Sequence, residues 1–138
     1  MTGQFPHNID AKSRLFIPAK LREELGDVFH VTIGQDGCLW VFSDADWNAF
    51  MEDLKSQPYS KVKRLRPFFA NAADCVPDAQ GRILIPAKLR QHAALEKEVI
   101  INGSFGRLEL WNPDRWNAIE SASLESGDWE QAMEEMGL

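Results

Sequence analysis

The chain has 138 residues, of which 44% are hydrophobic and 26% are charged, and its formal net charge is -6. This balance is typical of a globular protein and excludes a disordered one. A half of about 65 residues would be only marginally stable alone, so we expect the two halves, or several chains, to share a core.

Several classes of protein are disfavoured by the composition. No apolar run approaches the roughly 20 residues that span a bilayer, and the N-terminus lacks the basic and apolar stretches of a signal peptide. Cys38 and Cys75 do not form a close pair, so we expect neither a disulfide framework nor a zinc site. A cytoplasmic protein is the expectation that fits best.

The negative charge is concentrated at one end. Residues 117–138 contain six acidic residues and no Lys or Arg, whereas residues 1–116 contain 15 acidic and 15 basic residues. The tail therefore carries the entire net charge. The remainder is neutral overall and can still carry local basic patches.

A long internal repeat organises the chain. "DAKSRLFIPAKLR" at residues 10–22 returns as "DAQGRILIPAKLR" at residues 78–90, and nine of fourteen positions are identical between residues 10–23 and 78–91. The similarity continues with an offset of 69 at four further positions. These are Gly34, Gly37, Leu39 and Trp47, which match Gly103, Gly106, Leu108 and Trp116. The sequence therefore predicts a duplicated unit of about 65 residues.

The first unit is predicted to begin with a short buried strand, "RLFI", and a helix of about two turns that starts near Pro18. Gly26 is a plausible end for that helix. Two apolar runs follow, "VFHVTI" and "CLWVF", separated by "GQDG", and predict a hairpin. "SDADWNAFMEDLK" then predicts an amphipathic helix with Ser43 or Asp44 as its N-cap.

The second unit repeats this order. Its equivalent segments are the strand "RILI", the helix "PAKLRQHA", the hairpin "EVIIN" and "RLELW" around "GSFG", and the helix "NPDRWNAI" with Asn112 as its N-cap. Residues 56–74 between the units predict a loop, a helix that ends near Pro67, and a turn. Residues 123–138 have no firm pattern, so we expect a frayed helix or a mobile tail there.

The repeat resembles a known family. The chain of about 140 residues contains twice an Asp-x-x-x-Arg turn followed by Ile-Pro-Ala-Lys-Leu-Arg. This duplicated motif resembles the sequences of the bacterial MraZ family. "GQDGCLWVF" and "RPFFANAADCVPDAQGRILIP" resemble that family too, and the resemblance covers roughly residues 1–120. A single Asp-x-x-x-Arg would carry no weight, whereas two copies in matched contexts are specific.

The resemblance implies an α+β fold. Two tandem β-α-β-β-α units of the AbrB/SpoVT type would form an intertwined β-barrel with flanking helices. We expect the units at residues 1–55 and 75–122, a connecting segment at 56–74 and an acidic tail at 123–138. The resemblance also implies a transcriptional regulator of the division and cell-wall gene cluster. It would bind promoter repeats as a homo-oligomeric ring and associate with the nucleoid.

Arg14 and Arg82 are the principal candidates for DNA contact. Each follows a turn, and Asp10 and Asp78 lie four residues earlier, where a carboxylate can cap the turn or pair with the arginine. The planar guanidinium suits phosphate oxygens or the O6 and N7 atoms of guanine. By chemistry alone, a structural ion pair is the simpler interpretation. The duplication and the resemblance favour DNA contact for the arginines and a positioning role for the aspartates.

Other basic residues are secondary candidates. Lys12 adds a cation to the first turn, where the second turn has Gln80, so the first should contribute more to salt-dependent affinity. Ser13 stands where the second turn has Gly81, although a left-handed turn position favours glycine. Lys20 and Lys88, with Arg22 and Arg90, either form solvated helix faces or broaden the basic surface. Residues 61–66, "KVKRLR", form either a phosphate-binding patch or a solvated face with Val62 and Leu65 inward.

The remaining motifs favour packing over chemistry. Trp40, Trp47, Trp111 and Trp116 are expected in the core or between subunits, and Phe68 and Phe69 in a packing element. His7, His30 and His92 are scattered, and no catalytic, phosphate-loop or metal-ligand spacing is present. We therefore expect no enzyme, cofactor, small-molecule substrate or membrane partner. The alternative to a DNA-binding regulator is an oligomeric protein-interaction scaffold without specific DNA readout.

Overall fold

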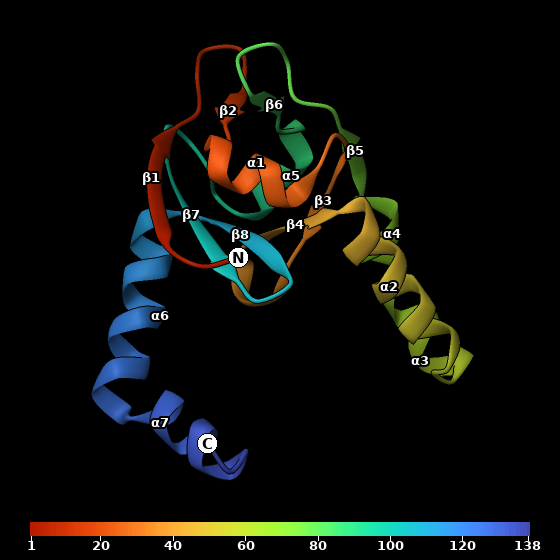
Figure 1. Ribbon diagram of the computed structural model, residues 1–138, viewed down its shortest axis with the longest axis vertical. Helices are drawn as coiled ribbons and strands as arrows, with labels where there is room; N and C mark the ends of the chain where they lie inside the picture. Colours follow the sequence, from red (N-terminus) through yellow and green to blue (C-terminus); the bar gives the residue numbers. More distant parts are fainter.

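A six-stranded antiparallel sheet combines strands from both halves of the chain in the order β1-β7-β8-β4-β3-β5 (Figure 1). The computed structural model describes residues 1–138. Its six strands are β1 (Gln4–Asn8), β3 (Phe29–Ile33), β4 (Leu39–Ser43), β5 (Ala73–Cys75), β7 (Glu98–Ser104) and β8 (Arg107–Trp111). The α+β class is confirmed, and no closed barrel is present in this strand pairing.

The two repeats meet directly in a second, smaller sheet. β2 (Arg14–Phe16) pairs antiparallel with β6 (Arg82–Leu84), and Leu15 lies opposite Ile83 at the centre. Both central residues are fully buried. Equivalent segments of the two halves are therefore partners, and neither half completes this sheet alone.

The short helix predicted in each unit is present. α1 (Ala19–Leu25) and α5 (Ala87–His92) each follow a proline, and they bury Leu21 and Leu25 in the first copy and Leu89 in the second. Gly26 ends α1 with φ of 83°, a left-handed value that glycine adopts without steric cost. Both helices place their apolar side against the core.

The hairpins and the longer helices are confirmed as well. α2 (Asp44–Lys55) begins after Ser43, whose side chain accepts a hydrogen bond from the backbone N–H of Asp46. α6 (Pro113–Ser126) begins after Asn112, whose side chain accepts hydrogen bonds from two backbone N–H groups, and Pro113 occupies the first turn. These caps satisfy N–H groups that a helix end leaves unpaired.

The connecting segment differs from the prediction. It forms α3 (Tyr59–Val62), the 3-10 turn η2 (Lys63–Leu65) and α4 (Arg66–Ala70) in succession. The prediction of a helix that ends near Pro67 is wrong, because Pro67 lies in the first turn of α4. Proline lacks an N–H group, and the first turn of a helix is where that group has no partner anyway.

The C-terminal segment also differs from the frayed helix or mobile tail that the sequence predicts. α6 continues to Ser126, Gly127 adopts φ of 70°, and a further helix, α7 (Asp128–Glu135), follows. α7 exposes its acidic and apolar side chains to solvent. Because it has no face buried in the core, its sequence lacks the hydrophobic periodicity that predicts a core-facing helix.

Two strands were not predicted at all. β1 contains Pro6 and mostly polar residues, and β5 has only three residues. Both lie at the edges of the large sheet, each paired on one side only. Edge strands tolerate proline and polar residues because one side of the backbone has no ladder to maintain.

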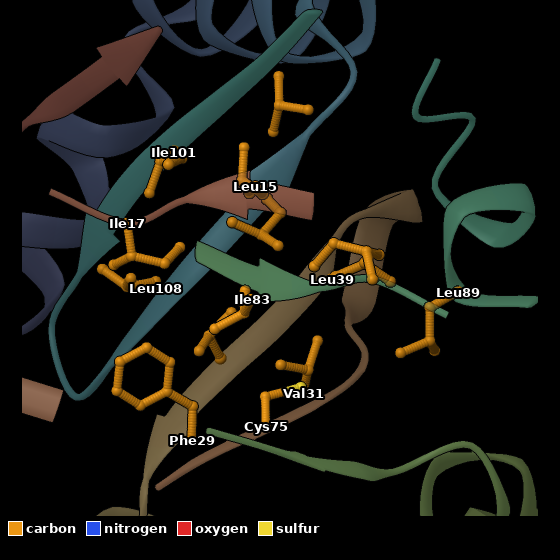
Figure 2. Close-up of a cluster of buried hydrophobic side chains, with 14 of the residues drawn as sticks. Leu15, Ile17, Phe29, Val31, Leu39, Cys75, Ile83, Leu89, Ile101 and Leu108 are labelled. Atoms are coloured by element: carbon orange, nitrogen blue, oxygen red, sulfur yellow. The ribbon is translucent and has the colours of Figure 1, made fainter. Parts of the chain in front are cut away.

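One hydrophobic cluster of 19 buried residues joins the two sheets and the short helices (Figure 2). Leu15, Ile17 and Phe29 come from the first half, and Ile83, Ile101 and Leu108 from the second. The expectation that the halves share a core is therefore confirmed. None of the helices combines the length and the hydrophobicity that a membrane span requires.

Candidate nucleic-acid interface

Each Asp-x-x-x-Arg turn is closed by its own aspartate. Asp10 Oδ1 accepts hydrogen bonds from the backbone N–H groups of Lys12 and Arg14, both at 2.9 Å. Asp78 Oδ1 accepts the equivalent bonds from Gln80 and Arg82, again at 2.9 Å. A short carboxylate that binds the backbone two and four residues ahead fixes a tight turn. The two copies thus have the same local geometry.

Each turn contains one residue in the left-handed backbone conformation. Gly81 has φ of 79°, and Ser13 occupies the matching position with φ of 63°. Their backbone N–H groups donate to the carbonyl oxygens of Asp78 and Asp10. The first turn therefore keeps the shape of the second although its residue carries a Cβ atom.

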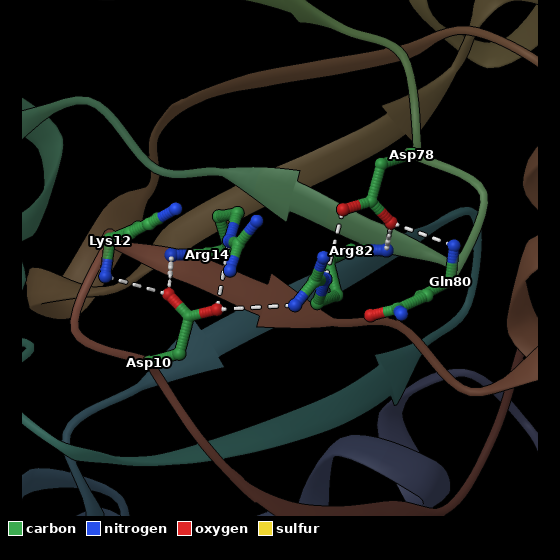
Figure 3. A network of polar contacts seen from close by, with 6 residues as sticks. All are labelled: Asp10, Lys12, Arg14, Asp78, Gln80 and Arg82. Atoms are coloured by element: carbon green, nitrogen blue, oxygen red, sulfur yellow. Dashed lines mark hydrogen bonds and ion pairs between the residues drawn. The ribbon is translucent and has the colours of Figure 1, made fainter.

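The same aspartates also hold the arginine side chains (Figure 3). Arg14 Nε donates to Asp10 Oδ2 at 2.8 Å, and Arg82 Nε donates to Asp78 Oδ2 at 2.9 Å. The arginine side chains are 29% and 26% exposed. Each bond to Nε fixes the plane of a guanidinium whose outer Nη atoms make no hydrogen bond within the chain, and only Arg82 Nη1 has an ion-pair partner there, Asp10. A fixed, partly exposed guanidinium can present those donors to a phosphate or a base edge.

The two turns lie side by side at one end of the molecule, because β2 and β6 pair antiparallel (Figures 1 and 3). Arg82 Nη1 lies 3.6 Å from Asp10 Oδ2, a contact between the repeats. The sequence alone did not predict this contact. The signal that could have revealed it is the near identity of the two strands, since equivalent strands can pair with each other about an approximate twofold axis.

The turn geometry changes the acidity of both aspartates. The backbone N–H of Arg14 lowers the pKa of Asp10 below its ordinary value of 3.8, assisted by the Arg14 side chain and the Lys12 backbone. The backbone N–H of Arg82 does the same for the pKa of Asp78, assisted by the Arg82 side chain and the Gln80 backbone. Partial desolvation opposes both shifts. Both groups are therefore carboxylates at neutral pH, as the ion pairs require.

The predicted lysines lie around these turns without joining the ion-pair network. Lys12 is exposed within the first turn, and Lys20 and Lys88 are exposed on α1 and α5. None of the three forms a salt bridge or donates a side-chain hydrogen bond. Their ammonium groups are thus available to a polyanion.

Arg22 and Arg90 make hydrogen bonds that position the short helices. Their Nε atoms donate to the carbonyl oxygens of Ile17 and Ile85, at 2.8 and 3.0 Å. These bonds tie each short helix to the strand before it. Arg22 also lies over Gly81 of the other repeat, where an added Cβ atom would come within 2.6 Å of its guanidinium carbon.

The aromatic residues pack together, as expected. Trp111 is buried, and Phe68 stacks on Trp47 with centroids 5.7 Å apart. His30 lies 2.7 Å from Asp44 and 2.9 Å from Asp74, and its ring stacks on Trp47. This arrangement fastens the start of α2 to β3 and β5.

Neither cysteine is suited to nucleophilic chemistry. Burial raises the pKa of the Cys38 thiol to about 12, and burial raises that of Cys75 to about 11. Thiols with such values are almost entirely protonated at neutral pH, whereas reactive cysteines are thiolates. No group of three His, Cys, Asp or Glu side chains is arranged to hold a metal ion.

Comparison with known proteins gives a consistent result. The family described as "MraZ protein, putative antitoxin-like" matches residues 1–65 and 68–136, one match for each half. A transcriptional regulator MraZ of Lachnoclostridium phytofermentans is 47% identical over 128 residues, which cover 91% of this chain and 89% of that protein. The protein of the same name from Heliobacterium modesticaldum is 46% identical over 90% of this chain and 89% of its own length. The one from Halothermothrix orenii is 44% identical over 99% of this chain and 98% of its own length.

Proposed function

Because this chain belongs to the MraZ family, we propose that it is a transcription regulator that binds double-stranded DNA through its two Asp-x-x-x-Arg turns. The observation that carries the proposal is the pair of guanidinium groups, Arg14 and Arg82, each fixed by its own aspartate at the same end of the molecule. Asp10 and Asp78 position the arginines and do not themselves contact DNA. We propose no catalytic activity and no cofactor for this chain.

The contacts divide into two kinds. Arg14 and Arg82 donate through their Nη atoms to guanine O6 and N7 or to phosphate oxygens. Lys12, Lys20 and Lys88 neutralise nearby phosphates and release counterions, which makes affinity depend on salt. Since the charge is placed locally, a chain with a net charge of -6 can still bind a polyanion.

A single pair of turns offers few contacts, so we propose that affinity comes from assembly. The chain would form a homo-oligomeric ring that presents several equivalent pairs to repeated boxes in a promoter. Linking such sites raises apparent affinity by roughly 10²–10⁴ without a new type of contact. The target would be the promoter of the division and cell-wall gene cluster, and the protein would act in the cytoplasm at the nucleoid.

The fold proposal follows the same resemblance. We propose that the two sheets around the shared core correspond to an intertwined barrel of the AbrB/SpoVT type. The tandem units would span residues 1–55 and 75–122, with a connecting segment at 56–74 and an acidic tail at 123–138. The pairings of β2 with β6, β1 with β7 and β4 with β8 support this interleaving.

The test combines two double variants. Arg14→Ala with Arg82→Ala should abolish the retarded band in mobility-shift experiments on the repeat-containing promoter, and size-exclusion chromatography should show unchanged assembly. Arg14→Lys with Arg82→Lys is the matched variant. It retains both charges and loses the planar fork, so sequence preference should fall while the salt dependence of binding persists.

Unchanged promoter binding by the alanine variant would refute the assignment. The alternative, an oligomeric scaffold without specific DNA readout, predicts another result. Wild-type protein would then bind promoter and random DNA equally.

A further inference from the structure

The C-terminal helices leave an apolar stripe exposed to solvent. Trp129 and Met133 of α7 and Met136, its C-cap, are spaced four and three residues apart, so they lie on one face of the helix. They are 48%, 43% and 66% exposed, and Leu138 beyond them is 82% exposed. Large apolar side chains grouped in this way mark an interaction surface more often than isolated ones do.

The same segment is strongly acidic. Asp128, Glu130, Glu134 and Glu135 surround the stripe, and all four are exposed. None forms a salt bridge, and no basic residue occurs from position 117 to the end. We call α6 and α7 together the acidic arm. α6 has 14 residues, so it carries the stripe about 21 Å from the start of the arm.

A complementary surface lies on the other helices. A cavity of about 390 Å³ opens between α2 and α3, with Met51, Leu54, Tyr59, Val62 and Phe69 as its apolar lining. Tyr59 is 74% exposed. We call this surface, with the basic residues beside it, the basic cradle.

Four basic residues beside the cavity are unpaired, whereas Lys55 in its lining forms a salt bridge with Glu52 of α2 at 3.0 Å. Lys61, Lys63, Arg64 and Arg66 are exposed and form no salt bridge within the chain, and residues 56–70 contain no acidic residue. The basic run noted in the sequence therefore borders an apolar cavity. A phosphate backbone does not fill apolar space, whereas an acidic amphipathic helix matches both the cavity and its border.

The two surfaces cannot meet within one chain. Figure 1 shows the acidic arm and the helices of the basic cradle on opposite sides of the sheets, extending beyond the same end of the body. The Asp10–Arg14 and Asp78–Arg82 turns lie at the opposite end. A DNA molecule seated on both turns would therefore lie away from the basic cradle.

We propose that the acidic arm of one copy of this chain seats its apolar stripe in the basic cradle of the next copy. The inference rests on the assembly proposed above and names the surfaces that make it. The contact is heterologous, since two different surfaces of the same chain meet, and such contacts close into rings when the rotation between neighbours permits. Every subunit of such a ring would hold its two arginine turns in the same orientation relative to the ring axis.

Charge reversal on exposed residues tests this contact without disturbing the core. The arm variant carries Glu130→Lys and Glu134→Lys, and the cradle variant carries Lys61→Glu and Lys63→Glu. Each variant sets like charges against each other in a ring of identical copies. For each variant, the protein concentration at which half of the chains are assembled should be at least about tenfold higher than for the wild type. Light scattering after size-exclusion chromatography measures this concentration. A control with Asp27→Lys and Glu96→Lys makes the same charge change as the arm variant, but on the body, and should assemble normally.

Recombining the variants gives the decisive result. An equimolar mixture should assemble with both variants in equal amounts, because each arm then meets a cradle of opposite charge. A chain that carries all four substitutions should assemble alone for the same reason. Failure of both recombinations would overturn the pairing of these two surfaces.

Other outcomes separate this contact from the proposed function. A wild-type protein that is monomeric at micromolar concentration would overturn both the ring and the contact. A wild-type ring with arm and cradle variants that assemble normally would overturn only the contact. A cradle variant that assembles normally and loses DNA affinity would show that the basic cradle holds phosphate instead of the neighbouring arm.

Discussion

Asp10 of the first turn lies 3.6 Å from Arg82 of the second, measured from Oδ2 to Nη1. The same oxygen accepts the Nε–H of Arg14 at 2.8 Å. Asp78 pairs only with Arg82, at 2.9 Å. The two halves of the candidate interface are therefore asymmetric, since one aspartate faces both arginines and the other faces one.

Asp10→Asn should consequently reduce promoter affinity more than Asp78→Asn. The first substitution removes the negative charge that holds two guanidinium groups, and the second removes the charge that holds one. Titration of both variants with the same promoter fragment at one salt concentration provides the comparison. Equal losses would mean that the cross-repeat contact has no role in presenting Arg82.

Lys12 and Gln80 occupy equivalent positions and form a natural exchange pair. In a plot of log affinity against log salt concentration, Lys12→Gln should make the slope shallower by about one for each turn in contact with DNA. Gln80→Lys should make the slope steeper by a similar amount. The measurement is the slope of log affinity against log salt concentration. Slopes that do not change would indicate that the turns lie outside the reach of phosphates.

Gly81 and Ser13 should respond differently to substitution. Gly81→Ala should destabilise the fold by about 1–3 kcal/mol, because φ is 79° there and the new Cβ atom meets Arg22. Ser13→Gly should change stability little, since relief of the left-handed strain offsets the greater freedom of the unfolded chain. Denaturant unfolding at a fixed protein concentration measures both. A tolerated Gly81→Ala would show that Arg22 can move aside.

The two aspartates should make the turns acid-sensitive. Their pKa values in the folded chain are below 3.8. The stabilisation that the ionised carboxylates provide is therefore fully present above their pKa in the unfolded chain. It is lost as the pH falls through their lower pKa in the folded chain. Thermal melting between pH 5 and pH 2 should therefore show a decline that is weaker in a variant with Asp10→Asn and Asp78→Asn. A variant with the same decline as the wild type would assign the acid sensitivity to other carboxylates.

The repeat and its local chemistry were predictable because they depend on neighbours in sequence. Asp10 and Arg14 are four residues apart, and a turn between them leaves few other conformations. The caps at Ser43 and Asn112 follow from the same short-range rules. The hairpins were predictable from apolar runs interrupted by paired glycines.

The features that were missed depend on distant partners or on solvent. β1 is polar and contains Pro6, and only its pairing with β7 makes it a strand. The contact of Asp10 with Arg82 requires the register of β2 against β6. α7 buries no residue, so no core-facing periodicity identified it. Proline at position 67 predicts a helix end, although proline is equally suited to a helix start.

The antiparallel pairing of β2 with β6 has an evolutionary consequence. Two separate molecules of a single-repeat ancestor could make the same pairing as a symmetric dimer, with identical turns. Gene duplication followed by fusion joins those turns covalently and ends the requirement that they be alike. Lys12 opposite Gln80, and an aspartate shared by two arginines, are differences that a fused chain can acquire, and in the proposed interface they would allow it to read a DNA site that is not a palindrome.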